Sequence, residues 1–228
     1  MIRVSVCMAT FNGENYLKEQ LESILYQLAN NDELIISDDS STDDTISIVE
    51  SFRDSRIKVF KNTLGKGPVK NFENSISKAN GRVIFLADQD DIWNANKVKT
   101  ILSAFESDPN LTCIFSNAAI INGEGKNVDK NFFAGKPNLS IINVLLKNQF
   151  LGCTMAFLNI KVNLLPFPQN LPMHDWYIGL QHLKKGKVRF IDQNLIFYRR
   201  HGKNVTTGIR SNLFNVLKWR FQIIKSLL

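Results

Sequence analysis

Residues 4–13 read Val-Ser-Val-Cys-Met-Ala-Thr-Phe-Asn-Gly, a short apolar run that ends in a polar loop. A run of this kind is typical of a buried strand. Residues 15–28 follow with leucine and isoleucine at helical spacing, and 34–36 form a second apolar run. Further strands are expected at 57–60 and 83–87, with helices that end at Phe52, begin at Pro68 and cover 96–105. Strand and helix thus alternate, which predicts a doubly wound parallel α/β sheet.

The second half of the chain is less regular. Residues 112–119 and 152–158 are predicted strands, separated by a loop at 122–138 that is rich in glycine, asparagine and lysine. Residues 187–191 and 195–200 are predicted to form a hairpin around Asp192-Gln193-Asn194, since such residues favour turns. No linker and no internal repeat divides the sequence. We therefore expect one domain whose sheet is mixed in its second half.

Composition and charge exclude several classes of protein. The 228 residues are 44% hydrophobic and 21% charged, which is ordinary for a globular protein and excludes general disorder. Cys7, Cys113 and Cys153 lie far apart without zinc-ligand spacing, so we expect buried, reduced thiols. The first residues do not resemble a signal peptide, and no apolar run reaches the ~18 residues of a membrane span. We expect a cytoplasmic protein, with the inner face of the plasma membrane as a second expected location.

The strongest chemical signal is Asp88-Gln89-Asp90-Asp91, which follows the strand at 83–87. Ligands of doubly wound sheets bind where loops leave the carboxyl ends of strands. Mg²⁺ and Mn²⁺ bind one or two carboxylates together with phosphate oxygens, and Asp88 and Asp90 can point to one side of an extended backbone. The alternative is a solvated acidic turn that caps the next helix. An EF-hand is excluded, because the required glycine and distal glutamate are missing.

Two further loops reach the same edge of the predicted sheet. Asp39 follows the strand at 34–36 and could accept a hydrogen bond from a pyrimidine imide or a ribose hydroxyl. Its alternative role is helix capping, which Ser41, Thr42 or Asp43 could also fulfil. The loop that starts at Ala9 contains one glycine, Gly13, so it is neither a dinucleotide-binding fingerprint nor a phosphate-binding P-loop.

Together these three loops resemble the nucleotide-sugar-binding half of family 2 glycosyltransferases. The opening strand with Thr10-Phe11-Asn12-Gly13, the element Asp38-Asp39-Ser40-Ser41-Thr42-Asp43 and the DxD motif Asp88-Gln89-Asp90 occur in the family's order. The local form Asp-Gln-Asp-Asp-Ile-Trp is similar to that of rhamnosyltransferase-like members. The resemblance implies a GT-A fold, with a Rossmann-like, mostly parallel sheet and a mixed second half.

The resemblance also implies an activity and a division of the chain. The activity is inverting transfer of a sugar from dTDP-rhamnose or a UDP-hexose to a glycan or lipid-linked acceptor in surface polysaccharide synthesis. Residues 1–208 would be a single GT-A catalytic domain, with a nucleotide-sugar-binding half at 1–120 and an acceptor-side half at 121–208. Residues 209–228 would be a C-terminal amphipathic helix.

Roles of donor-site residues follow from their positions in the family's motifs. Asp39 would bind the pyrimidine base, with Thr10 and Phe11 in the same pocket. Asp90 would ligate the Mg²⁺ or Mn²⁺ that bridges the donor diphosphate, and Asp88 would support the ribose or the metal. Lys70 falls where relatives often carry a basic donor contact, although a solvated helix lysine explains it equally well.

The general base that an inverting enzyme needs is implied at Asp175, which follows Pro172 at the start of a predicted helix. Its alternative role is that of a helix N-cap. His174 precedes it where many relatives carry glutamate, so the role of His174 stays open. In Tyr198-Arg199-Arg200-His201, His201 is preferred over either arginine as the contact to the departing diphosphate. The alternative is the basic end of a hairpin.

The C-terminal segment 211–228 interleaves apolar residues with Lys218, Arg220 and Lys225. A helix of this composition suits the surface of an anionic membrane, and packing against the catalytic domain is the alternative. Arg210 would add to the positive charge of the segment.

Other function classes fit less well. A family member that binds sugar nucleotide without turnover is disfavoured by the intact Asp39, Asp90 and Asp175. Sugar-nucleotide pyrophosphorylases carry a glycine-rich, arginine-containing first loop, which residues 9–13 lack. A net charge of +7 suggests a nucleic-acid partner, but carboxylates crowd the loops where such a sheet would bind one. We therefore expect no nucleic-acid binding.

Overall fold

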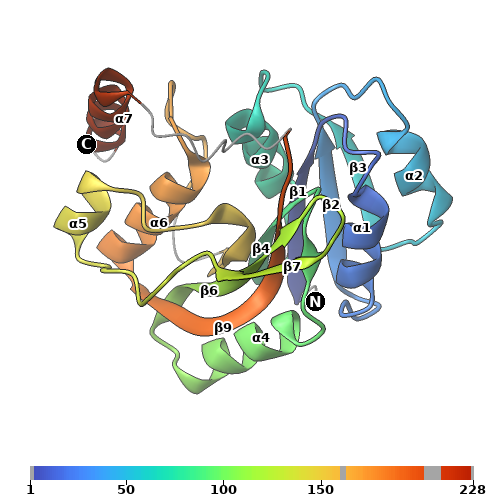
Figure 1. The fold of residues 1–228 in the computed structure, drawn as a ribbon, viewed down its shortest axis with the longest axis horizontal. Helices are drawn as coiled ribbons and strands as arrows, with labels where there is room; N and C mark the ends of the chain where they lie inside the picture. Colours follow the sequence, from blue (N-terminus) through green and yellow to red (C-terminus); the bar gives the residue numbers. More distant parts are fainter. Residues whose placement is uncertain (1–2, 160–162, 203–211, 227–228) are drawn as a thin grey trace.

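The computed structural model describes residues 3–159, 163–202 and 212–226, within which nine strands form one sheet (Figure 1). The strands are β1 Val4–Thr10, β2 Glu33–Asp38, β3 Ile57–Lys61, β4 Val83–Asp88, β5 Ile92–Trp93, β6 Leu111–Asn122, β7 Asn127–Asn131, β8 Met155–Leu158 and β9 Lys187–Arg200. The helices are α1 Leu17–Leu25, α2 Thr45–Ser51, α3 Pro68–Ser77, α4 Lys97–Ser107, α5 Ile141–Leu146, α6 His174–Lys185 and α7 Leu213–Lys225, with a 3₁₀ turn at Gly152–Thr154.

The sheet has the order β3-β2-β1-β4-β8-β6-β9-β5, with β7 beside β6. The first half is parallel throughout, because β1 pairs with β2 and β4, and β2 pairs with β3. The second half is mixed: β8 runs antiparallel to β4 and β6, whereas β9 runs parallel to β6. The predicted mostly parallel sheet with a mixed second half is therefore confirmed.

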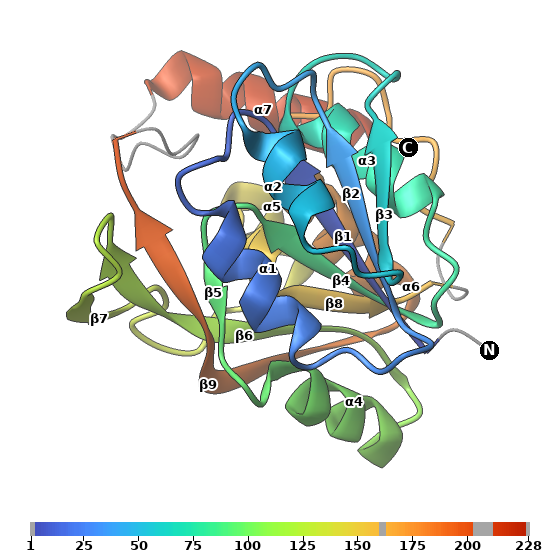
Figure 2. The same cartoon turned by 90° about the vertical axis from the view of Figure 1, so that its right-hand side faces the viewer.

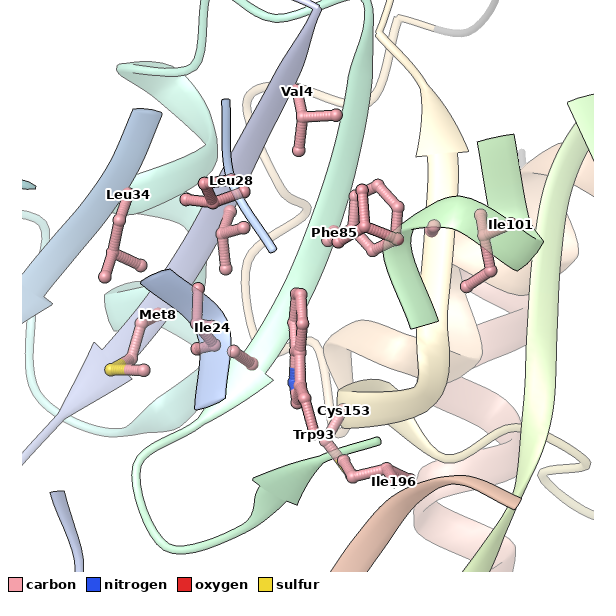
Figure 3. Packing of buried hydrophobic residues seen from close by; sticks show 14 of the residues in the cluster. Val4, Met8, Ile24, Leu28, Leu34, Phe85, Trp93, Ile101, Cys153 and Ile196 are labelled. Carbon is pink, nitrogen blue, oxygen red and sulfur yellow. The ribbon is translucent and has the colours of Figure 1, made fainter. Parts of the chain in front are cut away.

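Alternating side chains of the central strands build a core on each face of the sheet. Val4, Val6 and Met8 of β1 pack on the face covered by α1 and α4, as Figure 3 shows for Val4 and Met8 beside Ile24 and Phe85. Cys7 points to the opposite face, which α3 and α6 cover. This period of two is the reason why near-continuous apolar runs mark strands buried on both sides. Cys7, Cys113 and Cys153 are buried free thiols, as predicted.

The hairpin predicted around Asp192 is wrong, because β9 is one continuous strand beside β6. The register moves from Ser116 paired with Ile191 to Asn117 paired with Asn194, which leaves the two intervening residues as a bulge. Asn117 Nδ2 of β6 donates to Asp192 Oδ1 of β9 at 2.9 Å. Asp192, which was expected in the turn, is thus hydrogen-bonded to the neighbouring strand. Pairing with β6 therefore keeps this segment extended where a turn was expected.

Other elements differ less from the prediction. The helix expected to be capped by Ser41 or Thr42 begins at Thr45, because the Ser41 hydroxyl instead donates to Asp38 Oδ1 at 2.5 Å. The predicted loop 122–138 contains the short strand β7, and α5 was not predicted. The predicted C-terminal helix is present as α7, while the proposed boundary at 208/209 and Arg210 lie outside the described residues. In the part of the chain that the structure describes, no helix has the length and apolarity needed to cross a bilayer.

Candidate active site

The loops after β1, β2 and β4 surround a cavity of about 470 Å³ at the carboxyl edge of the sheet, the end toward which the arrowheads of β2 and β3 point in Figure 2. The sequence predicted ligand contacts at this edge, and six of the predicted residues line the cavity: Thr10, Phe11, Asp39, Asp88, Asp90 and His201. Lys70 and Asp175 are not among its lining residues. The topology therefore brings most of the predicted donor site into one place.

Thr10 links the end of β1 to the end of β2 through hydrogen bonds. Its hydroxyl donates to Asp38 Oδ1 at 2.9 Å, and its carbonyl accepts hydrogen bonds from the Asp39 N–H and from Asn71 Nδ2, both at 2.9 Å. The hydroxyl therefore already has a partner within the protein, and Thr10 is buried at the wall of the cavity. Its contribution is to hold Asp39 in position.

Asp39 is oriented by two donors from the chain segment before α3. The Gly67 N–H donates to Asp39 Oδ2 at 2.7 Å, and Asn62 Nδ2 donates to Oδ1 at 3.0 Å. Gly67 has a φ of 96°, a conformation that favours glycine. Each carboxylate oxygen can accept two hydrogen bonds, so Asp39 keeps acceptor capacity for a ligand N–H or hydroxyl.

Gln89, the middle residue of the DxD motif, joins the acidic loop to the first loop. Its Oε1 accepts from the Phe11 N–H at 2.9 Å, and its Nε2 donates to the Phe11 carbonyl at 3.0 Å. Gly13 makes this contact possible, because a Cβ at that position would lie 2.3 Å from Gln89 Oε1. Phe11 is 54% exposed at the rim of the cavity. No role was predicted for Gln89 from the sequence.

The three aspartates of the acidic loop face two directions. Asp88 and Asp90 line the cavity, and Asp90 Oδ2 lies 2.8 Å from His201 Nε2. Asp91 is buried, and its Oδ1 accepts from the Arg199 N–H at 2.9 Å. Burial, then the charges of Asp90 and Asp175, raise the pKa of Asp88. A bound divalent cation would offset this concentration of negative charge.

Asp88, Asp91 and the thiol of Cys153 also approach one another within 4.8 Å. This group is a poor match for Mg²⁺ or Mn²⁺ bound to a diphosphate, because Asp91 and Cys153 are buried and a thiol is a soft ligand. The carboxylates of Asp88 and Asp90, which face the cavity, fit such a cation better. Hard oxygen ligands and room for phosphate are what that ion requires.

Two buried cations lie behind the acidic loop. Arg199 donates from Nε to the Asp90 carbonyl at 2.8 Å and pairs through Nη2 with Glu19 Oε2 at 2.5 Å. Lys97 donates from Nζ to the Cys153 carbonyl at 2.7 Å and lies 4.2 Å from the ring centroid of Trp93. Burial lowers the pKa of Lys97 to about 8. Arg199 therefore holds the loop through a hydrogen bond, whereas Lys97 lies close enough for the charges of Asp91 and Asp88 to act on it.

The roles of Arg199 and Lys97 were not predicted from the sequence. Lys97 occupies an apolar face of α4 together with Ile101 and Phe105, so its helical spacing was a signal that it is buried. For Arg199 the signal was its place in a strand. His201, preferred over the arginines, lines the cavity and packs against Tyr16 with the two rings tilted and their centroids 4.7 Å apart.

Asp175 lies in the first turn of α6, near enough to Asp88 for its charge to raise the pKa of Asp88. Asn148 Nδ2 donates to Asp175 Oδ1 at 3.1 Å, and the Trp176 N–H donates to the same oxygen at 2.7 Å. Burial raises the pKa of Asp175 to about 6, against these hydrogen bonds. The N-cap of α6 is Met173, so Asp175 is not the capping residue.

His174 is held by packing. Its ring stacks on Phe72 with centroids 4.1 Å apart, and burial lowers its pKa to about 3. A Cβ on Gly152 would lie 2.9 Å from His174 Nε2 and 3.4 Å from the Asp175 Cβ. The neutral imidazole therefore fills the space beside Gly152 and fixes the start of α6, which gives the open role of His174 a structural answer.

Lys70 is engaged away from the cavity. Its Nζ pairs with Glu73 Oε2 at 2.6 Å, one turn further along α3. The donor contact suggested for Lys70 stays a prediction, and it would require this ion pair to open.

A model of the family described as "Glycosyl transferase family 2" matches residues 5–201, which include every motif described above. The chain belongs to glycosyl transferase family 2. Transferase activity on sugars follows from this membership, and the matched region runs from β1 to His201 beside the cavity.

Among curated relatives, this glycosyltransferase is 32% identical to the Escherichia coli UDP-Glc:alpha-D-GlcNAc-diphosphoundecaprenol beta-1,3-glucosyltransferase WfgD, over 97% of this chain and 85% of the relative. It is 29% identical to the Shigella flexneri dTDP-rhamnosyl transferase RfbG, over 86% of this chain and 72% of the relative.

A solved structure with a similar fold is S. aureus TarS 1–349 in complex with UDP-GlcNAc. The TM-score is 0.76 at 20% identity, over 100% of this chain and 68% of that one. A mannosyltransferase from Pyrobaculum calidifontis in complex with GDP-Man and Mn²⁺ has a TM-score of 0.65 at 17% identity, over 99% of this chain and 61% of that one. The chain has the GT-A fold that the resemblance implied.

Proposed function

We propose that this glycosyltransferase moves a sugar, with inversion, from a UDP-hexose or dTDP-rhamnose to a saccharide on a lipid diphosphate carrier. The observation that carries the proposal is one cavity lined by an oriented Asp39 and by the acidic loop, with Asp175 close enough to Asp88 for its charge to act on that carboxyl. The donors named for WfgD and RfbG support these two donor classes. The acceptor named for WfgD also supports a lipid diphosphate acceptor.

In this proposal the donor lies with its pyrimidine against Asp39 and Phe11 and its diphosphate at Asp88 and Asp90. Asp39 accepts the imide N–H or a ribose hydroxyl. Asp90 and Asp88 hold a Mg²⁺ or Mn²⁺, which supplies charge neutralisation for the departing nucleoside diphosphate when it is bound. His201, beside Asp90, adds a hydrogen-bond donor for the same developing charge.

Asp175 acts as the general base on the acceptor hydroxyl. A base must be deprotonated yet basic enough to take a proton, and a carboxylate with a pKa near 6 meets both needs better than one at its ordinary value. Asn148 and the Trp176 N–H hold one of its oxygens, so the carboxylate has a fixed orientation. In this proposal the enzyme acts in the cytoplasm, at the inner face of the membrane that holds the lipid carrier.

Thermal unfolding with a panel of nucleotide sugars, with and without Mn²⁺, tests the donor site. A ligand at ~100 times its Kd stabilises the native state by about 2.7 kcal/mol. We expect UDP- or dTDP-sugars to raise the melting temperature when Mn²⁺ is present, and Asp90→Ala to abolish the metal-dependent part. If no pyrimidine nucleotide sugar stabilises the protein, or if Asp90→Ala responds like the parent, the assignment fails.

A further inference from the structure

We propose that α5 and α7 together form a docking surface for an anionic lipid bilayer, next to the side of the site where the acceptor enters. The surface consists of six apolar side chains, at least 47% exposed, that we call the α5–α7 face: Ile142, Leu146, Phe214, Leu217, Phe221 and Ile224. The inference rests on the proposed function, because docking to a membrane would bring the enzyme to a lipid-linked acceptor.

The exposed side chains of α7 lie on one side of the helix. Phe214, Leu217, Phe221 and Ile224 follow one another at intervals of three and four residues, which places them in one stripe. Phe214 is 74% exposed and Phe221 is 69% exposed. Such a contiguous stripe of large apolar residues marks an interaction surface, whereas single exposed apolar residues are common.

The opposite side of α7 already has a partner within the protein. Ile223 is fully buried in the core cluster under α6, and Trp219 packs against the same cluster. Arg220 Nε donates to the Leu146 carbonyl at 2.8 Å, which fixes α7 to the end of α5. The helix is therefore docked by one face while it presents a second apolar face outward. In Figure 1, α5 and α7 lie on the same side of the molecule.

Charge complementarity identifies the occupant as an anionic surface. Lys218 and Lys225 are exposed and follow Phe214 and Phe221 by four residues, so each lysine flanks an aromatic of the stripe. Lys147 extends the same pattern at the end of α5. The sequence contains no aspartate or glutamate between Asp129 and Asp175, and none after Asp192. Apolar residues bordered by cations, without anions, match the headgroup region of an anionic bilayer.

This surface is connected to the proposed base by a short chain of contacts. Trp176, the residue after Asp175, donates from its indole Nε1 to the Val144 carbonyl of α5 at 2.7 Å. α5 in turn carries the Leu146 carbonyl that holds α7. A bilayer seated on the α5–α7 face would thus lie beside the acceptor side of the site, where a lipid-linked saccharide has to present its hydroxyl to Asp175.

Co-sedimentation of the full chain with vesicles tests the proposal, using phosphatidylcholine alone or mixed with phosphatidylglycerol, at low and high salt. We expect binding to the mixed vesicles that high salt weakens. F214Q/F221Q should reduce the partition coefficient at least tenfold, since about 25 cal/mol is lost per Å² of apolar surface no longer buried. K218Q/K225Q should reduce the partition coefficient on the mixed vesicles about 20- to 30-fold, because each cation contributes about 1 kcal/mol of attraction to the anionic surface.

Matched controls lie elsewhere on the surface. Tyr26 is 82% exposed at the end of α1, and Tyr26→Gln should leave vesicle binding unchanged. K18Q/K99Q removes two exposed lysines from other helices and should reduce binding far less than K218Q/K225Q. Equal losses in both lysine pairs would contradict a localised surface.

Two further outcomes would overturn the docking surface. One is a parent protein that does not bind the mixed vesicles. The other is a self-associated chain that F214Q/F221Q makes monomeric, since the occupant would then be a second copy. Calorimetry of UDP and of dTDP with Mn²⁺ on the same samples separates the two proposals. Intact binding of either nucleotide without vesicle binding refutes this surface alone, whereas absent binding of both nucleotides refutes the donor site.

Discussion

The side-chain amide of Gln89 forms two hydrogen bonds with the backbone of Phe11, one to its N–H at 2.9 Å and one to its carbonyl at 3.0 Å. Through this pair, the loop with the DxD carboxylates is linked to the loop that follows β1 at the same cavity. A donor that spans both loops would find them already aligned, and preorganisation of this kind raises affinity because less ordering remains for binding.

We predict that Gln89→Leu weakens UDP binding about 5- to 30-fold, the equivalent of two ordinary hydrogen bonds. Calorimetry with Mn²⁺ measures the effect. The matched control is Gln27→Leu, because Gln27 also makes two hydrogen bonds to backbone atoms, to the Val98 N–H and the Ser23 carbonyl, away from the cavity. If both variants bind UDP as the parent does, the link between the loops has no role in donor binding.

Gly152→Ala should impair turnover while UDP binding persists. The added Cβ would approach His174 Nε2 to 2.9 Å, so the imidazole has to move, and Asp175 is the next residue in the first turn of α6. A misplaced base loses much of its effect, and we expect a decrease in kcat of at least tenfold. Gly135→Ala is the control, because a Cβ there meets nothing within 4 Å. An unchanged kcat in Gly152→Ala would show that Asp175 does not need its present position.

The raised pKa of Asp175 also predicts a pH-dependent cost in stability. The native carboxyl has a pKa of about 6 against 3.8 for the unperturbed group, so the native state holds this proton more tightly than the unfolded chain. Native stability therefore falls as pH rises from about 4 to about 6, and stays lower above that. Asp175→Asn removes this loss.

Chemical denaturation of the metal-free protein measures the sign of this change in stability. At neutral pH, Asp175→Asn should be more stable than the parent by about 1 to 2 kcal/mol, a value reduced from the full shift because the carboxyl retains some solvent contact. The difference should vanish near pH 4. A variant that is less stable at neutral pH would contradict the burial of an ionised base.

Turnover should follow the ionisation of the same group. The base form of Asp175 predominates above its pKa of about 6. The logarithm of kcat should therefore rise with pH at unit slope below pH 6 and level off above it. The measurement is a rate profile with saturating donor. A profile that is flat between pH 5 and pH 8 would assign the base to a group with a lower pKa.

Much of the fold could be predicted because its information is local. Strands that are buried on both faces need continuous apolar runs. Val83–Ala87 and Leu34–Ile36 are such runs, and all of their side chains are buried. Asp192-Gln193-Asn194 misled the prediction because turn preference is weak beside cross-strand bonds such as Asn117 to Asp192. Register in the mixed half depends on contacts between residues far apart in sequence, which no local pattern records.

The site divides in the same way. Asp39, Asp88 and Asp90 could be found because they lie at or just after the ends of strands, and the topology of parallel strands brings such residues to one edge. Arg199 and Lys97 could not be assigned, because their role depends on partners contributed by other elements, Glu19 and the Asp90 carbonyl for one and the Cys153 carbonyl for the other.

The most direct test of the account compares sugar transfer by the parent and Asp175→Asn, with donor binding measured on the same samples. The amide keeps the size of the side chain and the oxygen that accepts from Asn148 and Trp176, so the fold and the UDP site should persist. We predict a loss in kcat of ~10²- to 10⁴-fold with the Kd for UDP unchanged. Near-normal transfer by Asp175→Asn would contradict the account, because the acceptor hydroxyl would then be deprotonated without Asp175.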